Sequence, residues 1–451
     1  MSINVDKMEN EFSGLIDRKE NERKTKIYSA WKIAAAWILF SCCITGMVFV
    51  NTKAEKNLEF VAGLFLSVTF IYFLCKMVLS FTYRPVYKEP ENGIKVSVVI
   101  PSYNEDPEAV RKTIECLLEQ DYPLHEIMFV DDGSPDNTAY LEVVRMAADF
   151  EEEKALYSNL KNTNLIYHRF QKNQGKRAAQ SWGFEKASGD MIMIVDSDGY
   201  IYPDAVRELL KPFTDQKVLA VTGHVNARNL SENFMTRLQD VLYESAFRIG
   251  RGAQSITNTV LVCSGAISMF RKDFVVRNLP DFQHQTLFGK PMNIGDDRRL
   301  TTLALKEGGK TKYQATARCI TDVPQTIRQF FVQQVRWSKS FFIDTLIALE
   351  FAWKRPLMLL WLMGEGLIWI VFAVSSVITI TQISPSLLSL LFIYSAGYLI
   401  LSALANNVYY IFKNPLLYIA SPLFAFAQML LIFPIRIYAL LTLNENGWGT
   451  R

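Results

Sequence analysis

The chain has 451 residues, half of them hydrophobic, and a formal net charge of +3. This length excludes a single small module, and so small a net charge gives no reason to expect nucleic acid as a partner. The six cysteines show no CxxC spacing and three of them lie in apolar runs, so we expect free thiols rather than a disulfide framework or a zinc site. Charged residues become rare after Arg355, which predicts a cytosolic domain joined to a membrane domain.

The first 82 residues predict a cytosolic tail, residues 1–26, followed by a transmembrane hairpin, residues 27–82. The hairpin contains two apolar runs, Trp31 to Val50 and Leu58 to Phe81, and each is long enough to cross a bilayer at about 1.5 Å per residue. Basic residues such as Lys32 and Arg84 flank the pair on both outer sides. Because basic residues favour the cytosolic side, we expect the tail and the following domain in the cytosol.

Residues 83–322 alternate short β-branched runs with amphipathic stretches, which predicts an α/β domain with a mostly parallel sheet. The predicted strands are Val96 to Ile100, which Pro101 should end, Ile127 to Val130, Leu165 to His168 and Met191 to Val195. The predicted helices run from the cap at Asp106 and Pro107 to Gln120 and from Arg177 to Ala187. Polar clusters follow three strands. Since ligands of open α/β sheets bind beyond the carboxyl ends of the strands, these clusters predict one active-site crevice.

Residues 323–355 predict an amphipathic helix that begins at Thr321 or Asp322 with Pro324. Its apolar positions recur every three or four residues, at Ile327, Phe331, Val335, Ser338 and Phe342. Such a helix is expected to lie at the bilayer surface rather than to cross it.

Residues 356–443 predict a C-terminal transmembrane region. Two long apolar spans are expected, at Leu357 to Ile383 and at Ser386 to Phe412. A last apolar run, Leu416 to Leu443, contains Pro422, Pro434 and a charge at Arg436, so its path is open at this point.

Asp196 and Asp198 follow a buried strand as an Asp-x-Asp pair. Carboxylate oxygens at such a place suit Mg²⁺ or Mn²⁺, which would neutralise charge on a diphosphate leaving group, although a turn or cap is the alternative. Asp131 and Asp132 fit either a β-turn or hydrogen-bond acceptors for a base or ribose. The basic start of a helix at Gly175 to Arg177 fits either phosphate or uracil binding or a solvated helix end.

A candidate general base lies in the tetrad Gly295 to Arg298. An acceptor hydroxyl must lose a proton as a glycosidic bond forms, and a carboxylate such as Asp297 can accept it. A helix N-cap is the alternative, and it is favoured for this tetrad taken alone. Arg336 and Trp337 fit either a guanidinium on a diphosphate beside an indole on a sugar, or an interfacial anchor pair.

Taken together and in this order, the motifs resemble those of the processive membrane glycosyltransferases of family 2, which include hyaluronan, chitin and cellulose synthases. The resemblance extends from the first apolar run to the end of the chain and rests on Val98 to Asp106, Asp131 to Ser134, Gly175 to Arg177, Asp196 to Asp198, Cys263 to Gly265, Gly295 to Thr301, Gln333 to Trp337 and Trp448 to Arg451. It implies a GT-A-like cytosolic α/β domain embedded in an α-helical transmembrane domain, with interfacial amphipathic helices.

The resemblance also implies roles for single residues. It assigns the general base to Asp297, further catalytic roles to Arg336 and Trp337, and a divalent metal, Mg²⁺ or Mn²⁺, to Asp196 and Asp198. The residues expected to bind the UDP-sugar or the acceptor are Tyr103, Glu105, Asp131, Asp132, Lys176, Arg177, Asp198, Cys263, Ser264, Gly265, Asp296, Arg298, Gln333, Trp448, Thr450 and Arg451.

Residues 444–451 end in a Trp-Gly-Thr-Arg sequence like the one that some family members fold over the nucleotide. That role requires a cytosolic C-terminus, so Leu416 to Leu443 is expected to be a re-entrant or interfacial segment, or a broken pair of short crossings. The resemblance therefore implies a multi-pass protein of the plasma membrane, with the catalytic domain and both termini in the cytosol.

Within the family, Gly295 to Arg298 and Arg336 to Ser340 are most similar to hyaluronan synthases. This implies alternate transfer from UDP-GlcNAc and UDP-GlcA to a growing polysaccharide, with export across the membrane. Ala266 departs from the proline that these synthases usually have at the acceptor pocket. A chitin-type or other single-donor β-glycan synthase is therefore the alternative, and an inactive sugar-binding or transport protein is a third hypothesis, against which the retained carboxylates argue.

Overall fold

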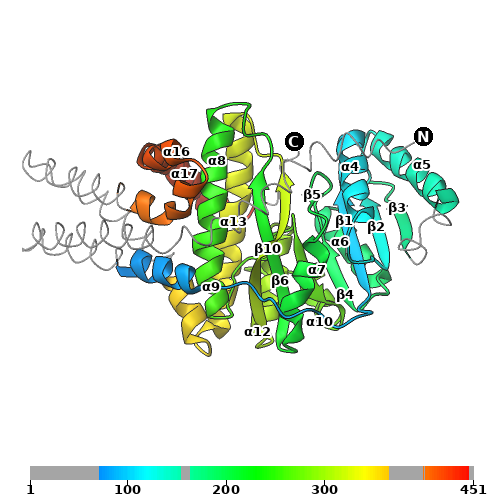
Figure 1. Cartoon of the computed structure of the whole chain (residues 1–451), viewed down its shortest axis with the longest axis horizontal. Helices are drawn as coiled ribbons and strands as arrows, with labels where there is room; N and C mark the ends of the chain where they lie inside the picture. Colours follow the sequence, from blue (N-terminus) through cyan, green and yellow to red (C-terminus); the bar gives the residue numbers. More distant parts are fainter. Residues whose placement is uncertain (1–70, 154–162, 365–399, 401, 446–451) are drawn as a thin grey trace, which may run out of the picture. The chain divides into compact units, whose positions relative to one another are not determined.

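The computed structural model describes residues 71–153, 163–364, 400 and 402–445 (Figure 1). The predicted tail, most of the predicted hairpin, most of the two long C-terminal spans and the terminal Trp448, Thr450 and Arg451 lie outside these residues. The description below concerns the central domain, the predicted amphipathic helix and the last apolar run.

Within the described residues, one sheet contains strands in the order β3-β2-β1-β4-β7-β6-β10-β5. Their bounds are β1 Val96–Ser102, β2 Glu126–Asp131, β3 Asn164–Arg169, β4 Met191–Ile194, β5 Tyr200–Ile201, β6 Val218–Ala227, β7 Ser268–Arg271 and β10 Lys310–Thr321. Strands β1 to β4 pair in parallel, as do β6 and β10, whereas β7 runs antiparallel between β4 and β6. The prediction of an α/β domain with a mostly parallel sheet is confirmed.

Most of the described helices alternate with the strands of the sheet along the chain, and α13, α16 and α17 follow its last strand (Figure 1). Their bounds are α4 Pro107–Leu118, α5 Thr138–Glu153, α6 Lys176–Lys186, α7 Ala205–Leu210, α8 Phe234–Glu244, α9 Gly252–Ile256, α10 Lys272–Arg277, α11 Leu279–Gln283, α12 Asp296–Lys306, α13 Ile327–Ala352, α16 Pro415–Ile419 and α17 Ser421–Leu441. A π-helix, η2 Ser245–Arg251, joins α8 to α9, and a small hairpin, β8 Thr286–Leu287 with β9 Lys290–Pro291, precedes α12.

The central strands are buried because their sequences are almost continuous apolar runs. Every residue of β1, β2 and β4 is buried, and side chains such as Val98, Phe129 and Met193 have no exposed surface. Burying a side chain of this size stabilises the fold by about 1.5–3 kcal/mol. Helix α6 approaches β1 closely because Gly183 faces Val99, where a Cβ would lie 2.5 Å from a methyl carbon.

Strand β1 continues to Ser102, so the prediction that Pro101 ends it is wrong. In a parallel sheet, successive residues direct their backbone groups to alternate neighbours. The Ser102 carbonyl faces β2, where it accepts from Asp132 N at 2.8 Å, and Pro101 faces the β4 side. The ladder between β1 and β4 ends at Val99, so the missing N–H of the proline removes no strand hydrogen bond.

Helix α13 begins at Ile327, so the predicted start at Thr321 or Asp322 is wrong. Strand β10 stays paired with β6 as far as Thr321, which keeps the chain extended past the predicted start. The helix instead has a capping box, in which Thr326 and Gln329 satisfy each other's backbone N–H groups.

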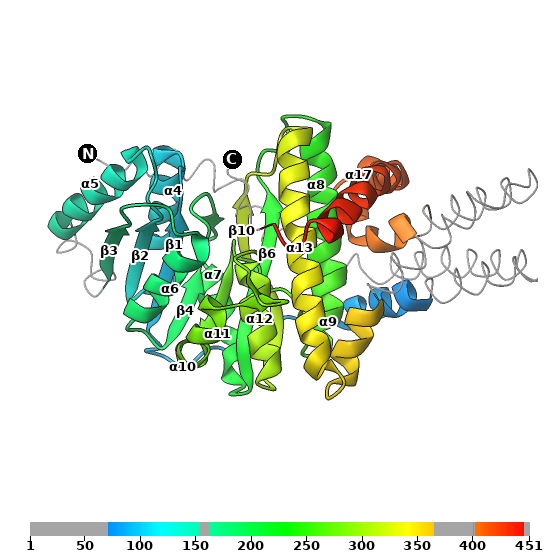
Figure 2. The ribbon, with the colours of Figure 1, turned by 180° about the vertical axis from the view of Figure 1, so that it is seen from behind.

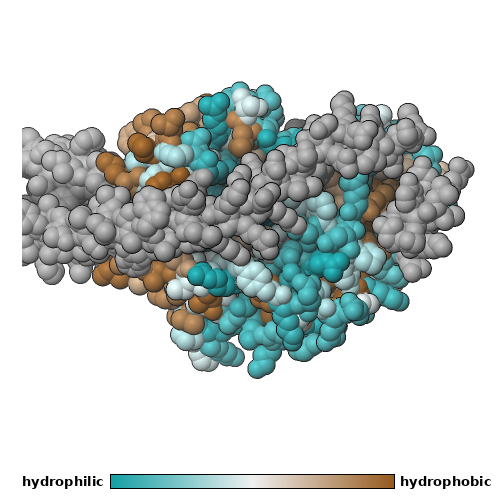
Figure 3. All heavy atoms as spheres, in the orientation of Figure 1, coloured by the Kyte–Doolittle hydropathy of each residue, from teal (hydrophilic) through white to brown (hydrophobic). Residues whose placement is uncertain are grey.

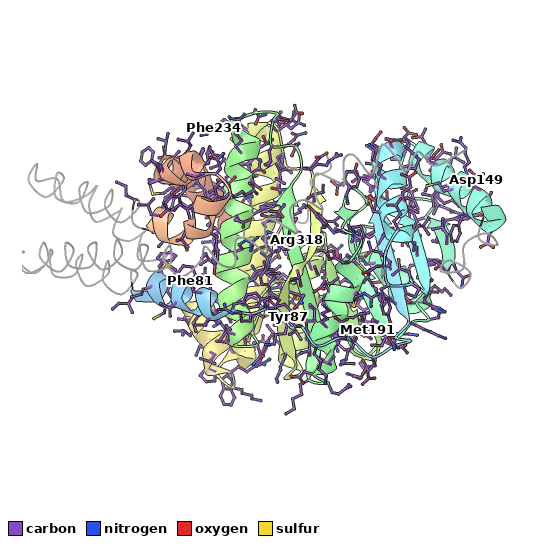
Figure 4. The ribbon with its side chains drawn as sticks, in the orientation of Figure 1. Phe81, Tyr87, Asp149, Met191, Phe234 and Arg318 are labelled. Atoms are coloured by element: carbon purple, nitrogen blue, oxygen red, sulfur yellow. The ribbon has the colours of Figure 1, made fainter. Side chains whose placement is uncertain are left out.

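Helices α8 and α13 lie side by side, with the sheet on one side and α16 and α17 on the other (Figures 1 and 2). Phe234, at the start of α8, lies 5.0 Å from Phe424 between ring centroids (Figure 4). The buried carboxylate of Asp240 accepts from Tyr410 Oη and Lys413 Nζ, both at 2.6 Å. These contacts attach the C-terminal apolar segments to α8.

Hydrophobic residues gather over α16 and α17, whereas hydrophilic residues cover the α/β domain (Figure 3). Among the described helices, α17 alone is long and apolar enough to cross a membrane. Pro434 lies inside this helix without ending it. A multi-pass topology, and the domain boundaries assigned from the sequence, stay predictions.

The close packing of α6 on β1 predicts that Gly183→Ala destabilises the chain by about 1–3 kcal/mol through overpacking. In an uncrowded helix, the same change should stabilise by up to about 1 kcal/mol. Gly252→Ala in α9 is the matched control, since its added Cβ would lie 3.8 Å from the nearest atoms. Thermal unfolding of the purified full chain should show a lower midpoint for Gly183→Ala alone. Equal midpoints for the two variants would contradict the packing described.

Candidate active site

The predicted polar clusters meet at one edge of the sheet. Strands β1, β2 and β4 are parallel neighbours, so the residues that follow them, including Tyr103, Asp131 and Asp196, lie at the same edge. Strand β7 is antiparallel to β4, so the stretch Cys263 to Gly265, which precedes β7, reaches that edge too. The convergence expected from the sequence is therefore present.

The centre of the site is the ammonium group of Lys176, the first residue of α6. Lys176 Nζ lies 2.5 Å from Asp196 Oδ1 and 3.9 Å from Asp296 Oδ2. Burial alone would lower the pKa of Lys176, but the two carboxylates outweigh it and raise the pKa. The lysine is therefore a charged group at neutral pH, and it joins α6 to the residues after β4 and to α12.

Asp131 and Asp132 hold the loops around this lysine. Both carboxylates of the pair are 2% exposed. Asp132 accepts from the backbone N–H groups of Gln174 and Gly175, both at 2.8 Å, which fixes the turn before α6. Asp131 accepts from Ser134 N at 3.2 Å. Contact with a base or ribose stays a prediction, and the backbone contacts are a role that the motif did not reveal.

Tyr103 and Glu105 lie half-buried on the loop after β1. Asn104 between them has a φ of 56°, and its N–H donates to Ser134 Oγ at 2.8 Å. This bond joins the loop after β1 to the loop that follows Asp131 at the end of β2. The two loops thus form one wall of the site.

Asp296 lies in the first turn of α12 and is held in its ionised form. It accepts from Gln180 Nε2 at 2.7 Å and faces the Lys176 ammonium. Burial would raise the pKa of Asp296, but the lysine charge and the Gln180 hydrogen bond outweigh it, and the pKa is lowered. The tetrad does lie at the start of α12, as the N-cap alternative predicts, but the N-cap residue is Gly295, with a φ of 77°, and it makes no side-chain cap hydrogen bond.

Asp297 has the opposite electrostatic environment. Burial raises its pKa, and the neighbouring charge of Asp296 raises it further. Its Oδ1 accepts from Arg298 N at 2.7 Å. The Arg298 guanidinium lies 5.3 Å from the ring centroid of Phe341 on α13, so the start of α12 rests against that helix. A carboxylate with a raised pKa is suited to accept a proton near neutral pH.

Asp196 and Asp198 follow β4, and Asp198 Oδ1 accepts from Thr321 Oγ1 at 3.4 Å. Among the described residues, no group of three or more His, Cys, Asp or Glu side chains is arranged to hold a metal ion. A magnesium ion is commonly bound by one or two carboxylates, with phosphate oxygens and water completing its shell. Asp196 and Asp198 supply two carboxylates, so the residues present fit a divalent metal that binds together with a diphosphate, and the Lys176 ammonium beside Asp196 would face the negative charge of that diphosphate.

The stretch Cys263 to Gly265 lines the site through its backbone. Cys263 N and Ser264 N donate to threonine hydroxyls at 2.9 and 3.1 Å. Gly265 lies so close to the ion pair that a Cβ there would be 3.6 Å from both Asp196 Oδ1 and Lys176 Nζ. Burial raises the pKa of the Cys263 thiol to about 12, so this cysteine is a neutral group rather than a nucleophile.

Helix α13 brings its predicted residues to the same region. The positive charge of Arg336 tends to lower the pKa of Lys176, although the two carboxylates raise that pKa overall. Trp337 is 43% exposed, and its ring centroid lies 6.2 Å from that of Tyr243. The side-chain oxygen of Gln333 is buried and has no hydrogen-bond partner among the residues that the structure describes.

Arg177 has partners that the sequence did not predict. Its side chain is buried, with 4% exposed, and its Nη atoms donate to Met292 O at 2.7 Å, Gln285 Oε1 at 2.9 Å and Ile294 O at 3.2 Å. Direct contact with a nucleotide stays a prediction for this residue. The observed contacts hold the segment that leads into α12.

Two residues near the site had no motif to identify them. Burial raises the pKa of Tyr243, at the end of α8, and the negative charge of Asp198 raises it further. Arg251, on the π-helix, donates to Val262 O at 3.0 Å. Burial lowers the pKa of Arg251 to about 10, although the negative charge of Asp297 raises it. Such one-turn π segments often occur at functional sites, but sequence periodicity does not reveal them.

Comparison with known proteins agrees with this geometry. Residues 97–277 match glycosyl transferase family 2, and residues 191–440 match glycosyl transferase family group 2. A hyaluronan synthase of Streptococcus pyogenes serotype M3 is 39% identical over 414 residues, which cover 91% of this chain and 96% of that protein. An N-acetylglucosaminyltransferase of Rhizobium meliloti is 31% identical over 360 residues, covering 79% of this chain and 81% of that protein.

A solved structure is also similar. It is a mannosyltransferase from Pyrobaculum calidifontis in complex with GDP-Man and Mn²⁺, with a TM-score of 0.56 and 20% identity over 83% of this chain and 99% of that chain. At this identity the likeness concerns the fold, and the α/β domain has a GT-A-like glycosyltransferase fold. The sheet, the carboxylates at its edge and the sequence matches along most of the chain lead to one conclusion: the chain belongs to glycosyltransferase family 2.

Proposed function

We propose that this chain is a hyaluronan synthase, which transfers GlcNAc and GlcA alternately from UDP-GlcNAc and UDP-GlcA to a growing polysaccharide and exports the polymer across the membrane. The observation that supports this most strongly is the 39% identity with a streptococcal hyaluronan synthase across 91% of this chain and 96% of that protein. The site agrees with transfer from a nucleotide sugar, because a charged lysine and a carboxylate with a raised pKa lie at the same edge of the sheet.

In this proposal Asp297 is the general base. It accepts the proton of the acceptor hydroxyl as the hydroxyl oxygen attacks the anomeric carbon of the donor sugar. The bond between that carbon and UDP breaks on the opposite side, so the configuration inverts and the electron pair leaves with UDP. Burial and the adjacent charge of Asp296, which both raise the pKa of Asp297, support this role.

Lys176 and Arg336 are proposed to stabilise the negative charge that develops on the departing diphosphate. Asp196 and Asp198 would hold Mg²⁺ or Mn²⁺, which when bound supplies further neutralisation of that charge. The 2.5 Å contact between Lys176 Nζ and Asp196 Oδ1 supports this division, because it keeps the ammonium next to the proposed metal ligands.

The remaining site residues divide between donor and acceptor in the proposal. Tyr103 and Glu105 lie on the loop after β1, and Asp131 and Asp132 lie at the end of β2 and just after it, which suits the base and ribose of UDP. Cys263, Ser264, Gly265, Gln333 and Trp337 are proposed to contact the acceptor sugar. A sugar hydroxyl would satisfy the buried Gln333 oxygen, and the exposed Trp337 ring suits stacking on a sugar.

We propose a multi-pass protein of the plasma membrane with the catalytic domain and both termini in the cytosol. The apolar helix α17 supports membrane insertion. Lys339 Nζ donates to Glu445 O at 3.1 Å, which holds the end of the described chain against α13. We propose that the terminal Trp448, Thr450 and Arg451 contact the nucleotide.

A single-donor β-glycan synthase is the second candidate. The 31% identity with an N-acetylglucosaminyltransferase of Rhizobium meliloti favours it, as does Ala266 beside the proposed acceptor pocket. Both candidates share the same chemistry at Asp297 and differ in the number of donors.

The two candidates predict different requirements for donors. Purified protein given UDP-GlcNAc and UDP-GlcA together should form a long polymer, and neither donor alone should do so. Polymer size can be followed by gel filtration and UDP release by a coupled assay. A long polymer from UDP-GlcNAc alone, unaffected by UDP-GlcA, would exclude the hyaluronan synthase function.

Asp297→Asn should reduce polymer formation by about 10²–10⁴-fold, the usual contribution of a general base, with nearly unchanged UDP affinity. The exposed Asp281→Asn on α11 is the control and should keep full activity. Turnover of the unmodified chain should fall as pH is lowered through the raised pKa of Asp297, because the base must be ionised to accept a proton. Normal polymerisation by Asp297→Asn would show that the base is elsewhere.

Removal of divalent metal with EDTA should abolish UDP release, and added Mg²⁺ or Mn²⁺ should restore it. Asp198→Asn should raise the metal concentration needed for half-maximal turnover, because it removes one of two proposed carboxylate ligands. Measuring turnover against metal concentration checks both statements. Full turnover in EDTA would contradict the assignment of a metal to Asp196 and Asp198.

A further inference from the structure

A chain of buried polar side chains connects α6 to α13. Arg177 Nη2 donates to Gln285 Oε1 at 2.9 Å, and Gln285 Nε2 donates to Asp344 Oδ1 at 3.3 Å. The exposed fractions of these residues are 4%, 1% and 1% in that order, so water does not compete for the contacts. Asp344 lies on α13, two turns after Arg336, and none of the motifs includes it.

This chain holds the segment that leads into the candidate base. Arg177 also donates to the carbonyls of Met292 and Ile294, at 2.7 and 3.2 Å. On the other side, Leu287 and Met292 pack in one apolar cluster with Ile343 of α13. The segment from Gln285 to Ile294 is therefore fixed between α6 and α13 by polar contacts on one side and apolar contacts on the other.

The next residue, Gly295, touches α13 directly. A Cβ at Gly295 would overlap the side chain of Ser340, and its φ of 77° favours glycine. Ser340 precedes Asp344 by one helical turn. The start of α12, and with it Asp297, is thus set by its distance from α13 as well as by its own helix.

Among the residues that the structure describes, Asp344 forms no salt bridge, and its hydrogen-bond partner is Gln285. Burial raises the pKa of Asp344 to about 7, and the negative charge of Asp297 adds to the increase. The positive charges of Arg298, Arg299 and Arg177 act in the opposite direction and lower the pKa. Asp344 Oδ2 has no hydrogen-bond partner in the part of the chain that the structure describes. Because an apolar side chain would be at least as stable in such a place, the carboxylate is better explained by what it holds than by stability.

We propose that Asp344 is a positioning residue for the transfer reaction: acting through Gln285 and Arg177, it fixes the segment before α12 and thereby the carboxylate of Asp297. The inference rests on the proposed role of Asp297 as the base. It assigns to α13 a second function beside the one proposed for Arg336. Asp344 itself touches neither donor nor acceptor in this account.

The first test compares Asp344→Ala with Glu350→Ala, an exposed acid on the same helix. Asp344→Ala should lower kcat for UDP release by about 10–100-fold, since an error of about 1 Å in a reacting group has an effect of this size. KM for the donors and the dissociation constant for UDP should change less than about twofold, because the loss concerns the transition state. Glu350→Ala should leave all three unchanged. Unchanged kcat for Asp344→Ala, or equal loss of kcat and UDP affinity, would overturn the proposal.

A second test remains informative if Asp344→Ala does not fold. Gln285→Glu alone places a carboxylate against that of Asp344 and should lower kcat. The double variant Gln285→Glu with Asp344→Asn reverses the direction of one hydrogen bond, keeps the number of charges and nearly keeps the volumes. The kcat of the double variant should be at least about tenfold higher than the kcat of Gln285→Glu. A double variant no faster than Gln285→Glu would overturn the proposal.

The tests separate this inference from the proposed function. UDP release counts each transfer whichever polymer forms, so the choice between one and two donors does not affect the result. Asp297→Asn in the same assay reports on the base. If Asp297→Asn kept normal turnover, the base assignment would fail by itself, whereas the comparison of Gln285→Glu with the double variant would still report on the chain of contacts.

Discussion

The ammonium group of Lys176 is the interaction on which the site depends. It faces Asp196 at 2.5 Å and Asp296 at 3.9 Å, and so it connects the start of α6, the end of β4 and the first turn of α12. Asp296 is buried, and a buried carboxylate without a cation is strongly unfavourable. Lys176 therefore compensates the charges of Asp196 and Asp296 at the sheet edge, and the backbone contacts of Asp132 hold the turn that precedes this lysine.

This charge also separates the properties of two adjacent aspartates. Asp296 faces Lys176 and accepts from Gln180, which lowers its pKa, and its negative charge then raises the pKa of Asp297. Neighbouring carboxylates with pKa values moved in opposite directions are the usual arrangement when one is structural and the other exchanges protons. Burial of Asp297 and the ionised state of Asp296 therefore both contribute to the proton affinity of Asp297.

The carboxylates at the sheet edge could be predicted from the sequence, because each follows a short apolar run and parallel strands end at a common edge. The contacts of Arg177 could not, since its partner Gln285 lies 108 residues away and no local pattern marks such a pair. The start of α13 was missed for the opposite reason. Local signals at Asp322 and Pro324 favour a helix, whereas pairing with β6 keeps the chain extended as far as Thr321.

Helix α13 buries polar side chains together with apolar ones such as Phe330 and Ile343, and it exposes several large apolar side chains. Lys339 and Asp344 are buried, whereas Ile327 and Phe331 are 62% and 41% exposed. Such a helix is stable where its outer face meets other apolar groups, as in the contact between Phe331 and Tyr438 of α17, 5.9 Å between ring centroids. Its inner face then supplies polar groups to the active site. Because one rigid helix provides both faces, the positions of the apolar segments and of the groups around Asp297 depend on each other.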